Sequence, residues 1–145
     1  MPNLITSLRE ALVADLLVEF PDAEVLSGVR SGKAVDKERL CVFWPGFGEL
    51  GGRVVVGEAR LHIRYWPVSP KVRDDAPSGV RDPGPLEQAA WDLAQLLQSK
   101  QTSYDATGAW FVRLVSCEPD YDPDEWGVEA IVSTMFSNPA VLETA

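Results

Sequence analysis

The apolar positions of this chain follow two helical stripes. Between residues 4 and 20 they recur every three or four residues, as on the buried face of an amphipathic helix. This stripe comprises Leu4, Leu8, Ala11, Leu12 and Leu16, widened by Ile5 and Leu17. A second stripe from Pro85 to about Lys100 predicts another helix, because proline suits a first helical position. Its apolar residues are Leu86, Ala89, Ala90, Leu93, Leu96 and Leu97.

Other stretches have the two-residue period of strands. The segment 58–67, EARLHIRYWP, is the clearest, and it predicts a strand buried on one face only. Ala59, Leu61, Ile63 and Tyr65 point one way, and Glu58, Arg60, His62 and Arg64 point the other. Strands are expected at about 23–29, 39–44, 53–66 (with a bulge at Gly57), 110–117 and 126–136.

The last two strands are expected to form a hairpin. If it is centred near Tyr121, Arg113 faces Glu129 as a cross-strand ion pair. Both strands are apolar on both sides. Phe111, Val115, Ile131 and Met135 are set against Val112, Leu114, Val128 and Val132.

The order of these elements predicts a single α+β domain spanning residues 1–145. Two helices cannot cover both faces of a sheet of four to five strands, so we expect two layers with both helices on one face. The sheet is expected to be mixed or antiparallel. A long flexible loop is predicted at about 67–85, where five prolines and six charges occur, and a frayed tail at about 138–145.

Composition narrows the function. No apolar run approaches a membrane span, and the N-terminus lacks the pattern of a signal peptide, so no membrane association is expected. The net charge of −9 argues against a protein whose main function is gripping nucleic acid. Cys41 and Cys117 lie in apolar runs, and we expect buried free thiols in a reducing cytosol.

Two features of the sequence are candidate signs of a nucleotide site or a catalytic site. Gly46, Gly48 and Gly51 match G-x-G-x-x-G, but a dinucleotide site needs a helix opening at the third glycine, and the sequence that follows is β-rich. His62 is the one histidine, and Glu58 on the same strand face is too far along the strand for contact. We therefore expect a surface or interface histidine and no catalytic residue.

The acidic stretch 118–125 has the D-x-D-x-D rhythm of a calcium loop at Asp120, Asp122 and Asp124. The glycine and glutamate that such a loop needs at its sixth and twelfth positions are replaced by Glu125 and Ile131. The stretch is therefore interpreted as a solvated hairpin tip, with adventitious metal binding left open. No metal or cofactor is predicted.

A sheet face that mixes rows of charge with large apolar groups favours a protein interface. The alternatives are another strand register, or the long loop folding back over this face. The candidate subunit-interface residues are Glu58, Arg60, His62, Arg64, Asp120, Asp122 and Asp124. The candidate contact loop contains Lys71, Arg73, Asp74, Asp75 and Arg81. Arg60 and Arg64 are expected to pair with the acidic 118–125 loop of a neighbouring chain.

Over about residues 3–137, the chain resembles the lambda-type tail terminators of long-tailed bacteriophages. The resemblance lies in length, element order and the central strand EARLHIRYWP. It implies a hexameric ring that caps the tail tube, stops tube polymerisation and provides the head-joining surface. The implied partners are the tail tube protein and a head–tail connector protein, with DNA passing through the pore without specific binding.

The same resemblance implies no catalytic residues, a location in the tail or neck of the virion, and assembly in the host cytoplasm. Two alternatives remain. One is another neck or tail-completion protein. The other is a small cytosolic enzyme or ligand-binding domain, which would need a concave pocket with convergent polar groups.

Overall fold

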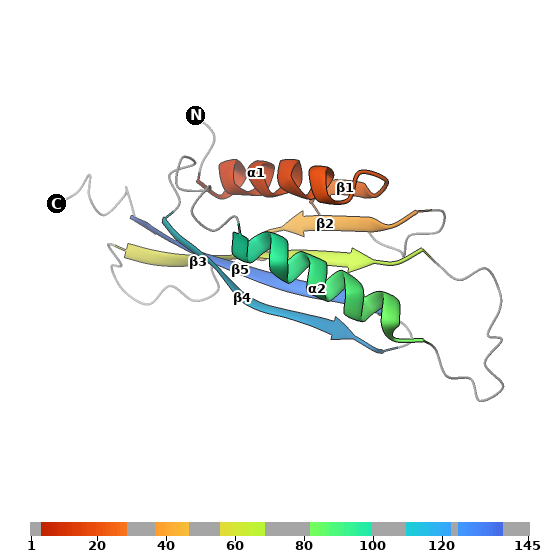
Figure 1. The fold of residues 1–145 in the computed structure, drawn as a ribbon. Coiled ribbons are helices and arrows are strands. Elements are labelled where there is room, and N and C mark those ends of the chain that lie inside the picture. Colours follow the sequence, from red (N-terminus) through yellow and green to blue (C-terminus); the bar gives the residue numbers. More distant parts are fainter. Residues whose placement is uncertain are drawn as a thin grey trace.

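The computed structural model describes residues 4–28, 37–46, 56–68, 82–99, 110–122 and 125–137. Within these ranges the elements are α1 (Leu4–Glu19), β1 (Glu24–Ser27), β2 (Arg39–Phe43), β3 (Val56–Trp66), α2 (Gly84–Ser99), β4 (Trp110–Asp120) and β5 (Gly127–Ser137). The strands form one mixed sheet in the order β1-β2-β3-β5-β4 (Figure 1). β1 is parallel to β2, and every other pair is antiparallel. The predicted α+β class is confirmed.

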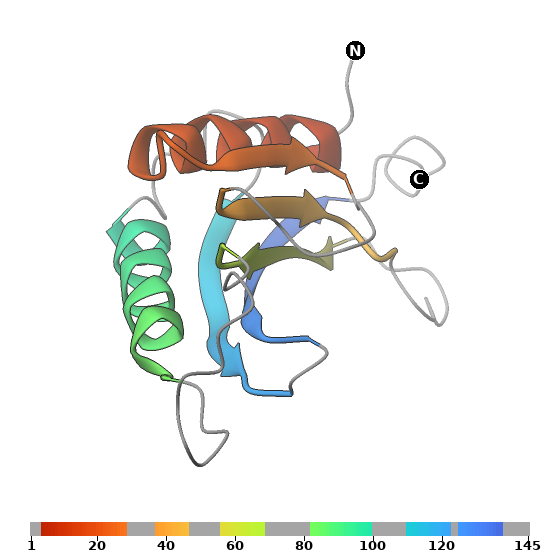
Figure 2. The same cartoon turned by 90° about the vertical axis from the view of Figure 1, so that its right-hand side faces the viewer.

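Both helices pack on one face of the sheet, as predicted (Figure 2). α1 packs against β1 and β2, whereas α2 packs against β4 and β5. Neither helix within the described ranges combines the length and the apolar character that a membrane crossing requires.

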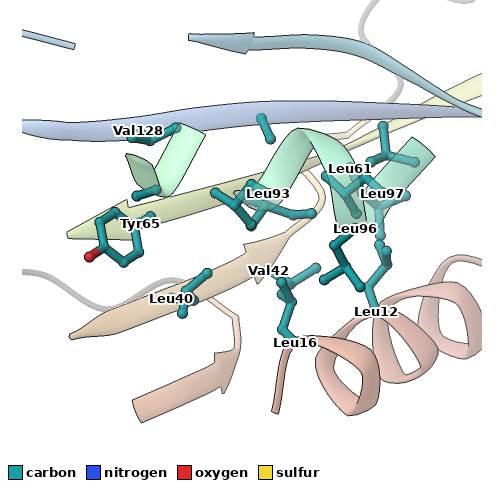
Figure 3. Close-up of a cluster of buried hydrophobic side chains, with 14 of the residues drawn as sticks. Leu12, Leu16, Leu40, Val42, Leu61, Tyr65, Leu93, Leu96, Leu97 and Val128 are labelled. Atoms are coloured by element: carbon teal, nitrogen blue, oxygen red, sulfur yellow. The ribbon is translucent and has the colours of Figure 1, made fainter. Parts of the chain in front are cut away.

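The core lies between the helices and the sheet (Figure 3). The predicted alternation of β3 is confirmed, because its apolar side chains at 59, 61, 63 and 65 are all buried. Next to them on β5 lie the buried Val128, Ala130 and Val132. Leu12 and Leu16 of α1 and Leu93 of α2 have no exposed surface and cover this layer on the helix side of the sheet.

The predicted bulge at Gly57 is wrong. β3 and β5 pair without a register shift from Val56 to Tyr65. The irregularities occur in β4 instead, between Trp110 and Arg113 and again after Leu114. β4 is an edge strand of the sheet, so an extra residue there disturbs one ladder and not two.

The predicted hairpin register is also wrong. β4 continues to Asp120, which pairs with Gly127, and Arg113 lies opposite Ser133 and not opposite Glu129. Pro119 does not end the strand, because an edge strand needs no backbone donor on its outer side. The hairpin is therefore centred beyond Tyr121.

Candidate interface on the outer face of the sheet

The face of the sheet that points away from both helices is here called the outer face. Among the described residues with described side chains, strand register places these on it: Glu24 and Leu26; Arg39, Cys41 and Phe43; Arg60, His62, Arg64 and Trp66; Glu129, Ile131 and Ser133; Arg113, Ser116, Glu118 and Asp120. They form rows across neighbouring strands. One row is Cys41–Arg64–Glu129–Glu118, the next is Phe43–His62–Ile131–Ser116, and a third is Arg60–Ser133–Arg113.

Arg64 is the centre of the first row. Its guanidinium lies 3.3 Å from Asp120, 3.3 Å from the carboxylate of Glu125 and 3.5 Å from Glu129. It also donates to the carbonyl oxygen of Glu125 at 3.0 Å and lies 5.7 Å from the ring centre of Trp66. Its side chain is only 12% exposed. A delocalised, planar cation suits this many partners, and here it ties the hairpin to β3.

This arrangement changes one expectation. The acidic stretch 118–125 was expected to meet Arg64 from a neighbouring chain, yet Asp120 and Glu125 bind Arg64 within the same chain. Glu58, also predicted for the interface, lies in β3, but its side chain is outside the described part of the structure. Arg60 is exposed on the third row.

The hairpin tip is an ordered turn. The backbone N–H of Asp122 donates to the Asp120 carboxylate at 3.1 Å, which is the local bond of an Asx turn. The backbone N–H groups of Glu125 and Trp126 both donate to the Asp122 carbonyl oxygen, at 2.9 and 2.7 Å. Asp124 lies outside the described residues. Within the described part, no group of three histidine, cysteine or acidic residues is arranged to hold a metal.

His62 does have a carboxylate in reach. Its Nδ1 atom lies 3.5 Å from Oε1 of Glu129, and its ring centre lies 5.4 Å from that of Phe43. The other oxygen of Glu129 pairs with Arg64. Sequence reasoning considered Glu58 alone, because the neighbour from β5 depends on the strand register. Glu129 is shared between two potential cations, which favours a structural ion pair over a free general base.

A shallow hollow of about 350 Å³ opens where the hairpin meets β3. Its lining includes Arg64, Ser116, Glu118, Asp120 and Glu129, together with apolar atoms of Ile131 and Tyr121. Carboxylates outnumber cations in this lining. The hairpin end of the outer face is therefore acidic.

Among the described side chains, the charged ones at the opposite end of the outer face are basic. Arg60 and Arg113 both lie opposite Ser133, one on each side of it, and both arginines are exposed. They stand about 10 Å apart across two strand spacings. Along β3, Arg60 is about 13 Å from Arg64. The described side chains thus give the outer face an acidic end and a basic end.

The titratable groups with shifted pKa values lie on the helix side. Burial, followed by the Glu38 carboxylate that accepts the Tyr65 hydroxyl at 2.8 Å, raises the pKa of Tyr65 well above its ordinary value. Burial raises the pKa of the Cys117 thiol to about 11, and this thiol donates to the Ala90 carbonyl at 3.3 Å. Both Cys41 and Cys117 are free cysteines, and Cys41 is fully buried. Tyr65 and Cys117 therefore stabilise the fold in their neutral forms.

The remaining predicted site residues lie outside the described part of the structure. Lys71, Arg73, Asp74, Asp75 and Arg81 of the candidate contact loop lie outside the described residues, as does the tail 138–145. Of the three glycines in the G-x-G-x-x-G match, only Gly46 is described, with a φ of 107°, and the next described element is the strand β3. Comparison of the sequence with protein-family models gives no match, and comparison with curated proteins gives none either.

Proposed function

We propose that this chain is a structural subunit of a phage tail terminator ring. The ring caps the tail tube, stops its polymerisation and provides the head-joining surface. The resemblance in element order supports this, because helix, short strand, two strands, helix and hairpin follow one another over the described residues. The subunit has no catalytic role, and its partners are further copies of itself, the tail tube protein and a head–tail connector protein.

The observation that carries the proposal is the charge polarity of the outer face. A ring with one repeated contact joins two different surfaces of the same chain, head to tail. The acidic hairpin end, with Glu118 and Glu129, complements the basic row of Arg60 and Arg113 on the next copy. Complementary ends fix the order and orientation of the copies and speed their encounter.

Arg64 is not the arginine that makes this contact. Three carboxylates of its own chain surround it. Reversing its charge would place four acidic groups together and damage the hairpin itself. Arg60 is the better probe of the contact between neighbouring subunits, here called the seam, because it is exposed and lies at the other end of the face.

A charge-swap experiment tests the head-to-tail contact. Arg60→Glu makes the basic end acidic, and Glu118→Lys makes the acidic end basic. Each variant alone should assemble at least about tenfold more weakly than the unmodified chain, because like charges then face each other. Mixed in equal amounts, the two variants should assemble again in alternation. Sedimentation velocity across a concentration series measures this, with circular dichroism as the control for folding.

Failure of the mixture to regain assembly would contradict the head-to-tail contact through these two ends. Normal assembly of each single variant would remove the outer face from the seam altogether. The tail terminator role has its own test. Added to the polymerising tail tube protein of the same phage, the chain should shorten the tubes and bind at one end in electron micrographs. Unchanged tube lengths would favour another neck or tail-completion protein.

A ligand-binding domain is the candidate of a different class. The hollow at the hairpin base, with its convergent polar groups, is the observation in its favour. We expect such a domain to stay monomeric as its concentration rises. A ring subunit forms oligomers instead, either by itself or on the end of the tail tube.

A further inference from the structure

A groove lies between the C-terminal ends of α1 and α2. Both helices cover the face of the sheet that is opposite the outer face (Figure 2). Its volume is about 480 Å³. It is lined by Asp15, Val18 and Glu19 from α1 and by Gln95, Leu96 and Ser99 from α2.

Two apolar side chains are unusually exposed at this groove and beside it. Val18 is 82% exposed on its rim, and Trp91 is 65% exposed on α2. Trp91 precedes Gln95 by four residues, so it stands one helical turn along the same face. Exposed apolar groups with a polar rim mark interaction sites, and tryptophan often dominates the energy of binding.

The charges of the described residues around the groove favour a cation. The C-terminal end of a helix carries partial negative charge, and two such ends meet here. Neither described helix has a basic residue in its last turn, while Asp15 and Glu19 add carboxylates at the end of α1. Acidic groups at this end of a helix oppose helix stability. α2 contains no lysine or arginine along its length.

We propose that this groove binds a basic amphipathic helix of a partner protein. A cleft between two helices has the shape that a third helix fills with its apolar face. The apolar anchors of the partner would contact Val18 and Leu96, and its lysine or arginine side chains would pair with Asp15 and Glu19. This docking surface is distinct from the outer face and does not depend on ring formation.

The probe is a synthetic peptide of lysine and leucine, with leucine at the spacing of one helix face. It should bind at one site in a calorimetric titration, more weakly as salt is added. In amide and indole NMR spectra, the shifts should concentrate on Val18, Gln95 and the indole of Trp91. A peptide with glutamate in place of lysine should not bind.

Two matched double variants locate the charge that matters. Asp15→Asn/Glu19→Gln removes two charges from the groove, and Glu10→Gln/Glu87→Gln removes two from exposed positions elsewhere on the same helices. The groove double should weaken binding about tenfold or more, and the control double less than about twofold. Val18→Ser tests the apolar contact without changing charge and should also weaken binding, with circular dichroism to confirm folding.

Four results would overturn the proposal. Equal losses in the two double variants would mean that net charge alone attracts the peptide. Equal binding of the acidic peptide would mean that the carboxylates play no part. NMR shifts centred on the outer face, or no binding of the basic peptide at all, would mean that the groove does not bind a helix.

Discussion

Leu93 has no exposed surface and faces the sheet from α2. Leu93→Asp would bury a carboxylate with no partner, which should lower the free energy of unfolding by about 4 kcal/mol or more. Urea unfolding followed by circular dichroism measures this. Trp91→Asp adds the same charge to the exposed side of the same helix and should cost far less. Equal losses in the two variants would contradict the assignment of the buried stripe.

Gly127 begins β5 at a point of close backbone approach. A Cβ atom there would overlap the carbonyl oxygen of Tyr65, a backbone atom of β3 that cannot turn away. Gly127→Ala should therefore lower stability by about 1–3 kcal/mol, in the range of overpacked cores. Gly84→Ala is the matched control, because the nearest atom to its Cβ is the carboxylate end of exposed Asp82, 3.1 Å away. A melting temperature unchanged in Gly127→Ala would show that the two strands can separate locally at no cost.

Cys117 predicts how stability depends on pH. Its pKa rises from 9.0 to about 11 in the folded chain, chiefly through burial, so the folded state holds the proton more tightly than the unfolded state. Stability from this group is fully present below about pH 9 and is lost as the pH rises to about 11. Unfolding free energies measured across this range should decline less steeply in Cys117→Ala than in the unmodified chain. Parallel declines would mean that other groups, such as Tyr65, account for the whole effect.

At the scale of elements, hydrophobic period and composition predicted the buried side or the bounds of some strands correctly and of others incorrectly. The alternation of β3 predicted its buried side chains, because a strand covered on one face must alternate. β4 was predicted to end at Cys117, since the acidic, proline-containing stretch after it is typical of a loop. The strand continues through Pro119 because of its edge position, which the sequence does not reveal.

Strand pairing explains most of what was missed at the site. With the hairpin centre beyond Tyr121, Glu129 lies opposite Glu118 and not opposite Arg113. Its place opposite Arg64, and with it the contact to His62, follows from the pairing of β3 with β5, for which the sequence predicted no register. Contacts between strands distant in sequence follow from pairing, and a one-residue shift changes which side chains meet. The charged row on β3 was predictable, whereas its partners were not.

Arg64 joins β3 to the tip of the β4–β5 hairpin, and its removal should loosen the hairpin tip. Arg64→Met keeps much of the side-chain volume but leaves Asp120, Glu125 and Glu129 without their shared cation. We expect a loss of about 1–3 kcal/mol and faster amide hydrogen exchange at the hairpin tip. Arg113→Met, on the exposed edge strand, is the control and should change neither quantity appreciably. Unchanged exchange at Trp126 in Arg64→Met would show that the turn alone orders the tip.

At the scale of the whole molecule, two surfaces on opposite sides of the sheet divide the proposed roles. We propose that further copies bind the acidic and basic ends of the outer face, and that a different partner binds the acidic, partly apolar groove between α1 and α2. A subunit with both can join a ring through one side and keep the other available. This arrangement suits a ring that must contact proteins above and below it.

The net charge of the chain leads to a prediction about DNA. Six chains at −9 each would surround the pore with a strongly negative field, and that field repels phosphate. We expect no binding of a labelled DNA duplex in fluorescence anisotropy at physiological salt, and none on lowering the salt, where phosphate contacts would strengthen. Salt-sensitive binding would instead mean that the basic row of Arg60 and Arg113 lines the pore and is not covered by the neighbouring chain. Arg113→Glu would then abolish that binding, and the seam would have to lie on another face.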